Sequence, residues 1–167
     1  MIIPTATMTS ARRNLFEPGQ AGAYHRVSRC VRRAWLCGID RYTGKSFEHR
    51  KPSVEARINQ LAEIFAVGIH TYAVMSNHLH VVLSVTARAT YHWPNEEVAR
   101  RWLVLYPPKP VDFPARHAEL CADPLRLKVL RERLAELSWF MKSLSEPIAR
   151  MANAEDNCKG RFWEGRF

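Results

Sequence analysis

An uncharged run of 24 residues, 64–87, constrains the fold of this chain more than any other feature. The run is long enough to cross a bilayer as a helix. Its middle, however, carries three histidines and Asn77, which are costly in hydrocarbon. Apolar and polar residues alternate on either side of Ser76. The run therefore predicts two strands, 69–75 and 78–85, joined by a turn, and we expect no membrane segment.

The second of these strands places two histidines on one face. Its apolar residues alternate with His78 and His80 and are expected to point to the core: Leu79, Val81, Leu83 and Val85. The two imidazoles then stand about 7 Å apart on the other face. Neutral imidazole binds divalent metals, so the pair is a candidate metal site. A His-x-His pair alone is a weak signal, and histidines satisfied by hydrogen bonds are the alternative.

The charge of the chain is strongly basic, with a formal net charge of +9 and a pI near 9.8. Residues 10–57 contain eleven Lys or Arg against four Asp or Glu, interleaved with aromatic side chains. A solvated surface is one interpretation, but this combination favours a nucleic-acid face. The residues expected to contact DNA phosphates are Arg26, Arg29, Arg32, Arg33 and Lys45, with Arg161 and Arg166 as further candidates.

The length of 167 residues suits a single domain. Residues 1–21 predict an irregular N-terminal arm, because they contain Pro and Gly and little apolar periodicity. Residues 22–167 are expected to form the domain, beginning with a strand at 24–31. Pro52 and Ser53 predict a helix start, followed by apolar residues at helical spacing.

Six of the ten prolines lie between residues 88 and 124, which we interpret as an insertion with a short helix at 95–105 and a Pro-stiffened excursion after it. A long helix is expected to begin at Leu125, with an apolar stripe facing the sheet along its whole length. Pro147 interrupts this helix, so a kink or break is expected near 143–146.

The four cysteines show no spacing typical of a zinc site. They are Cys30, Cys37, Cys121 and Cys158. Scattered, mostly buried thiols indicate a reduced, cytoplasmic protein, and the first ten residues do not resemble a signal peptide.

Several segments taken together resemble the HUH single-tyrosine transposases of small insertion sequences and the related REP-associated tyrosine transposases. The segment 75–82 resembles the His-hydrophobic-His signature of that family. The first strand is similar at Tyr24, His25, Val27, Ser28 and Arg29. The later helix and the segment after it are similar at Trp139, Phe140, Met141, Lys142, Ser143, Leu144, Ala149, Arg150, Asn153, Gly160, Phe162, Trp163, Glu164, Gly165, Arg166 and Phe167.

This resemblance implies an α+β domain with a ferredoxin-like antiparallel sheet and helices on one face, usually as a homodimer. It implies Mg²⁺ or Mn²⁺ at His78 and His80. In the family a tyrosine of the later helix attacks single-stranded DNA next to a hairpin and forms a 5′-phosphotyrosyl link, the first step of transposition and recombination.

The chain departs from this pattern at the nucleophile, because Ile148 occupies the tyrosine position. The third metal ligand of some relatives falls at Ala152, and Asn153 or His25 are possible substitutes. Water is one alternative nucleophile, and the side-chain alternatives are Tyr91, Tyr106, Ser143 and Ser145.

Three functions remain open. The first is a metal-dependent single-strand DNA endonuclease and transposase, and the second is a DNA-hairpin binding relic or domesticated protein without cleavage. The third is an RNA-binding ferredoxin-like module, which is weakest because no stretch matches the RNA-recognition strand motif. The sequence does not identify the DNA target or a substitute nucleophile.

Overall fold

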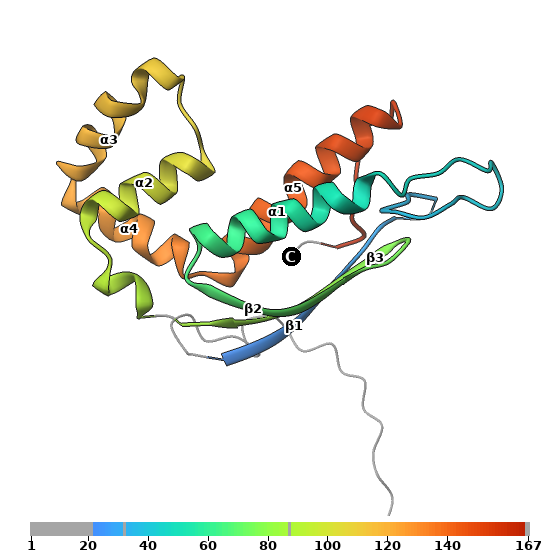
Figure 1. Cartoon of the computed structure of the whole chain (residues 1–167), viewed down its shortest axis with the longest axis horizontal. Coiled ribbons are helices and arrows are strands. Elements are labelled where there is room, and N and C mark those ends of the chain that lie inside the picture. The colour runs from blue at the N-terminus through green and yellow to red at the C-terminus, as the bar shows by residue number, and fades with distance from the viewer. Residues whose placement is uncertain (1–21, 32, 87, 166–167) are drawn as a thin grey trace, which may run out of the picture.

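The computed structural model of this chain describes residues 22–31, 33–86 and 88–165, so the expected arm at 1–21 lies outside the described residues. The described fold is α+β, with a three-stranded antiparallel sheet and five α-helices (Figure 1). The elements are β1 (Gly22–Arg29), α1 (Arg50–Ile64), β2 (Val67–Val74), β3 (His78–Val85), η2 (Ala89–His92), α2 (Asn95–Leu105), η3 (Pro110–Asp112), α3 (Phe113–Cys121), α4 (Pro124–Leu134) and α5 (Leu137–Glu155).

The sheet has the order β1-β3-β2, and β3 pairs antiparallel with both neighbours. The uncharged run forms the β2–β3 hairpin, closed by a hydrogen bond of 2.8 Å from the Met75 amide to the His78 carbonyl, so the prediction of two strands is confirmed. None of the described helices is both long and apolar enough to cross a bilayer. Helix α1 connects β1 to β2 past the central strand.

The core lies between one face of the sheet and the helices α1 and α5 (Figure 1). The four apolar residues of β3 are buried there as predicted, and so are Val54, Ile58 and Leu61 of α1. Helix α1 begins at Arg50, earlier than the predicted start at Ser53, since proline is tolerated in a first helical turn.

The predicted long helix from Leu125 is wrong: it is two helices, which separate at Ala135 and Glu136. Of the kink or break expected near 143–146, the break is wrong, because α5 continues through Pro147. Proline lacks the N–H that would bond the carbonyl four residues earlier. Here the Arg57 guanidinium donates to that Ser143 carbonyl from Nε and Nη2, at 3.1 and 3.0 Å.

Helices α2, α3 and α4 pack together beside α1 and α5, and η2 contacts α4; we call these four elements the lobe (Figure 1). Helix α2 has the predicted bounds, but the Pro-rich excursion contains a helix, α3, that the sequence analysis missed. Helix α4 packs mainly on α2 and α3, which corrects the expectation that its leucines face the sheet along their length. Its buried leucines are Leu127, Leu130 and Leu134.

The segment after α5 returns to β1. Cys30 and Trp163 form an isolated antiparallel bridge, and the Glu164 amide donates to the Arg29 carbonyl at 2.9 Å. The buried indole of Trp163 donates to the Ser145 carbonyl at 2.9 Å. This segment therefore ties the end of β1 to α5. Cys30 and Cys37 are buried, Cys121 is half-buried and Cys158 is exposed, and all four thiols are free.

Candidate metal and nucleic-acid site

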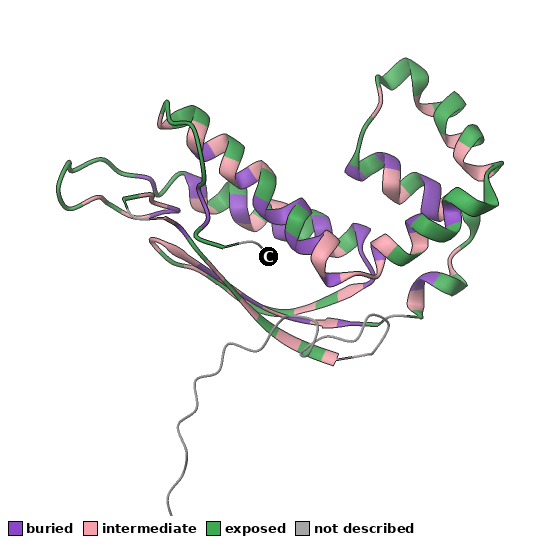
Figure 2. Ribbon diagram, turned by 180° about the vertical axis from the view of Figure 1, so that it is seen from behind, coloured by how far each residue is buried: buried purple, intermediate pink, exposed green. Residues whose placement is uncertain are grey.

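One face of the sheet is not covered by any described helix, and we call it the open face (Figures 1 and 2). Alternation along the strands places His78 and His80 of β3 on this face, opposite the buried side chains. The neighbouring strand β1 contributes His25, Val27 and Arg29. The three strands contain no Asp or Glu, so nothing within them makes this face acidic.

Three histidine rings gather on the open face. His25 Nε2 lies 3.0 Å from His80 Nδ1, and the two rings stack with centroids 5.3 Å apart. The rings of His78 and His80 have centroids 6.1 Å apart. His78 Nδ1 donates a hydrogen bond of 2.7 Å to Asn77 Oδ1. Both β3 histidines are thus oriented by a hydrogen bond at Nδ1.

These contacts determine which ring nitrogens are available for a metal. A histidine whose Nδ1 donates a hydrogen bond keeps Nε2 unprotonated as its metal-binding atom. His78 is in this state, and His80 is in it when His25 Nε2 accepts from His80 Nδ1. Two imidazole nitrogens would supply only part of the coordination shell of a divalent ion. Within residues 22–31, 33–86 and 88–165, no group of three or more His, Cys, Asp or Glu is arranged to hold a metal. Further coordination would have to come from water and phosphate oxygens.

The substitutes considered for a third ligand have different surroundings. Asn153 donates from Nδ2 to the Gly160 carbonyl at 2.9 Å, a structural role at the end of α5. Ala152, the position at which the resemblance would place a third ligand, is fully buried. His25 lies beside His80, and its Nε2 atom is hydrogen-bonded to the His80 ring. His25 therefore positions His80 and does not offer that nitrogen to a metal. Sequence spacing gave no support for His25, because the contact crosses from β1 to β3.

The expected nucleophile position lies away from the histidines. Ile148 is buried in the core, between the helices and the covered face of the sheet. Ser143 and Ser145 are buried in the same helix, so neither hydroxyl is presented to the open face. Tyr91 and Tyr106 belong to the lobe, where the centroids of the Tyr106 and Trp102 rings lie 4.8 Å apart with the rings tilted by 49°. None of these side chains is brought to His78 and His80 in the described structure.

The predicted basic residues do not form one surface. Arg29 is on the open face and pairs with Glu164 at 3.5 Å. Arg26 is on the covered face of the same strand, in register with Val81. Lys45 forms an ion pair of 3.2 Å with Asp156, which partly neutralises its charge.

Two further predicted contacts, Arg33 and Arg161, are exposed. Arg32 and Arg166 lie outside the described residues.

A hollow of about 890 Å³ lies where β1 ends, beside the β2–β3 turn, and we call it the loop pocket. It is lined by Arg29, Cys30, Val31, Arg33, Ala34, Trp35, Asp40, Tyr42, Thr43, Ser76, Asn77 and Glu164. The Cys30 amide donates to the Asn77 carbonyl at 2.9 Å, and the Leu36 amide donates to the Ser76 carbonyl at 2.6 Å. The loop is therefore held against the turn that leads to His78.

The buried Arg50 holds this loop to the end of α5. Its guanidinium donates to Glu155 and Asp156, both at 2.7 Å, and to the Trp35 carbonyl at 2.6 Å. The hydrogen bond from Arg50 is the largest of the effects that lower the pKa of Glu155 to about 2. Arg50 is one of the eleven basic residues of 10–57, but its structural role is not predictable from spacing, because its carboxylate partners lie 105 and 106 residues away in the chain.

Comparison of the chain with models of protein families, with curated proteins and with solved structures finds no match in any of the three.

Proposed function

We propose that this protein binds single-stranded or hairpin DNA on the open face and cleaves a phosphodiester bond there with the help of a divalent ion at His78 and His80. The observation that carries the proposal is the orientation of the two imidazoles: His78 Nδ1 donates to Asn77, and His80 Nδ1 faces His25 Nε2. Nε2 is then the nitrogen that each ring offers to a metal, in His80 when its proton is on Nδ1. Imidazole favours Mn²⁺ over the harder Mg²⁺, so both ions belong in the test.

The topology supports a ferredoxin-like domain. The described elements follow the order strand, helix, strand, strand, helix, with β3 between β1 and β2. This is the first part of the split βαβ arrangement. Residues 162–164 lie beside the end of β1, where a fourth strand would begin.

The chain's own residues would act as follows. Arg29, whose Cα is paired with that of His78, offers a cation for a phosphate beside the histidines when the phosphate replaces Glu164 in its exposed ion pair of 3.5 Å. A divalent ion bound at the histidines would polarise the phosphodiester and stabilise the leaving oxygen. Since Tyr91 and Tyr106, the tyrosines considered as nucleophiles, lie away from the histidines, the proposed nucleophile is water. The product is a hydrolysed strand with no covalent adduct.

Binding without cleavage is a second candidate, favoured by a specific observation. Ile148 is packed into the core, and the histidine pair has no third ligand among the described side chains. A protein of this kind would keep the DNA surface of a transposase-like ancestor and recognise a hairpin without cutting it.

Cleavage of a 5′-labelled DNA hairpin with a single-stranded flank, in Mg²⁺ or Mn²⁺, separates the two candidates. We expect shortened strands with the parent protein and none with His78→Ala or His80→Ala. The matched control is His92→Ala, an exposed histidine on the lobe, which should cut normally. Binding of the same hairpin without cutting in either metal would favour the second candidate. A covalent protein–DNA adduct would contradict water as the nucleophile and identify the residue responsible.

A further inference from the structure

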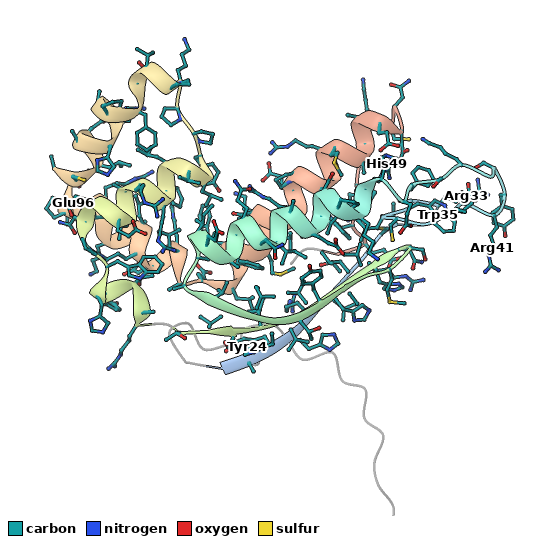
Figure 3. All side chains as sticks on the ribbon, viewed as in Figure 1. Tyr24, Arg33, Trp35, Arg41, His49 and Glu96 are labelled. Carbon is teal, nitrogen blue, oxygen red and sulfur yellow. The ribbon has the colours of Figure 1, made fainter. Side chains whose placement is uncertain are left out.

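We propose that the loop pocket binds one unpaired DNA nucleotide, with its base against Trp35 and Tyr42 and its phosphate at Arg33. This inference rests on the proposed DNA-binding function and adds the site at which a base is recognised. A volume of about 890 Å³ is within the usual range of small-ligand sites, roughly 300–1,000 Å³. Figure 3 shows Arg33, Trp35 and Arg41 together on the loop beyond β1.

The two aromatic side chains of the pocket are available for stacking. Tyr42 has 98% of its surface exposed, an unusual position for a large ring. Trp35 is half-buried, and no aromatic ring or cation among the described residues stacks on it. Flat aromatic faces bind bases of any sequence, because every base has a π-face. A nucleobase is therefore the ligand chemistry that this pair fits best.

The loop that carries Tyr42 is ordered before any ligand binds. Asp40 accepts hydrogen bonds from the Tyr42 amide at 2.9 Å and from the Thr43 hydroxyl at 2.7 Å. Gly44 completes the turn with a φ of +71°, a conformation in which glycine is favoured. On the other side, Arg50 holds the Trp35 carbonyl. The two rings are thus presented on a fixed frame, which reduces the entropy cost of binding.

The charges of the pocket favour a single phosphate. Glu164 forms an ion pair with Arg29, and the Asp40 carboxylate accepts hydrogen bonds from Tyr42 and Thr43 of its own turn. Arg33 is exposed, and no hydrogen bond or ion pair is recorded for it within the described residues. Its backbone has a φ of +68°, which is uncommon for a residue other than glycine and is found at functional positions more often than elsewhere.

The pocket adjoins the histidine site. Asn77 lines it and accepts the hydrogen bond from His78, so a nucleotide held there continues into the strand that the proposed function places on the open face. A base in a duplex is stacked and paired and cannot enter without being flipped out. The pocket thus favours unpaired DNA, and its preference should not depend strongly on sequence.

The test is fluorescence-anisotropy binding of labelled oligo(dT), of an abasic oligonucleotide of equal length, and of a duplex. We expect oligo(dT) to bind about tenfold or more tightly than the abasic strand, since stacking is worth roughly 1–3 kcal/mol per base. Tyr42→Ala and Trp35→Phe should weaken oligo(dT) binding and leave abasic binding unchanged. Tyr42 is too exposed for its truncation to unfold the protein. Tyr91→Ala is the matched control, because that ring is also exposed but lies on the lobe.

The outcomes separate this inference from the proposed function. Oligo(dT) binding that is equal in parent, Tyr42→Ala and Trp35→Phe overturns the loop pocket but leaves cleavage at the histidines standing. Equal binding of abasic and oligo(dT) strands overturns base stacking. Tighter binding of oligo(rU) than of oligo(dT) overturns the assignment to DNA. If His78→Ala abolishes cutting while Tyr42→Ala alone weakens binding, both proposals are supported.

Discussion

At the scale of one residue, Arg50 is a buried charge that the fold stabilises with several partners. Its guanidinium is 1% exposed, and it is bonded to two carboxylates and a carbonyl while it stacks on the Phe47 ring at 4.5 Å. A buried charge is tolerated only when it is paired and hydrogen-bonded to this extent. The group therefore fixes the loop of residues 30–49 to the end of α5, and with it the carbonyl of Trp35.

Stability should fall in acid because of Glu155. Its pKa is lowered to about 2 from an ordinary value of 4.5, so it binds fewer protons folded than unfolded between these values. Its contribution to the free energy of unfolding is complete above about pH 4.5 and is lost as the pH falls toward 2. Urea unfolding at a series of pH values from about 6 to about 2, analysed as a two-state transition, gives the free energy of unfolding and measures this loss.

The matched variant for that measurement is Glu155→Gln. It should be less stable than the parent at neutral pH, and the difference should shrink in acid. Glu97, whose pKa is also lowered to about 2, keeps its own contribution in both proteins and cancels from the difference. A difference that stays constant down to pH 2 would show that Glu155 is not the titrating group.

The candidate site was predictable from sequence only in part. The period of two in β3 was enough to place His78 and His80 on one face, because side-chain alternation is a local property of a strand. The place of His25 depends on the register between β1 and β3, in which it is paired with Val82. Register between strands so far apart in the chain is set by packing and is not readable from spacing.

At the scale of elements, α5 shows how a helix continues through a proline. The Ser143 carbonyl loses its usual partner at Pro147, and the Arg57 guanidinium from α1 replaces it. The sequence predicts the missing donor, but the replacement comes from a helix 86 residues away in the chain. Local reasoning therefore placed the break at the wrong point.

A double-mutant cycle tests this replacement. Arg57→Met should cost about 1–3 kcal/mol, because it leaves the Ser143 carbonyl unsatisfied. In a Pro147→Ala background the restored amide can bond that carbonyl, and the same substitution should cost less. Urea unfolding of the four proteins gives the coupling free energy. Equal costs in the two backgrounds would show that Arg57 does not compensate for the proline.

The start of α4 depends on a side-chain cap. Asp123 Oδ1 accepts a hydrogen bond of 2.9 Å from the Arg126 amide, whereas Asp112 before α3 makes no such bond. Asp123→Ala should lower the free energy of unfolding by about 1 kcal/mol. Asp112→Ala is the control and should have a smaller effect. Similar losses in both variants would contradict the cap as the cause.

At the scale of the whole molecule, burial and exposure are divided between the two faces of the sheet. The helices cover one face of the sheet and form the core with it, whereas no described helix covers the other face (Figure 2). The loop pocket lies at the end of β1, beside the β2–β3 turn. The net charge of +9 acts over the whole surface, but only certain cations are positioned at the candidate site. The excess counted in residues 10–57 therefore overstates the local charge, because Lys45 and Arg50 neutralise carboxylates.

The salt dependence of DNA binding should separate these cations. Arg33→Gln should reduce the slope of log K against log salt by about 1, the change expected for one lost phosphate contact. Lys45→Gln should change it less, since Lys45 is paired with Asp156. Arg150→Gln, on α5 and paired with Glu146, is the control. An unchanged slope with Arg33→Gln would show that Arg33 does not contact a phosphate.

The one-sided sheet also has an evolutionary consequence. Residues on its open face contribute little to the buried apolar area, so replacing them is nearly neutral for folding. Natural selection can then alter or discard the chemistry of that face while the scaffold survives intact. A lineage that had lost the proposed activity would diverge fastest at the histidines and at the exposed side chains of the loop pocket, and would stay most alike where β3 meets α1 and α5.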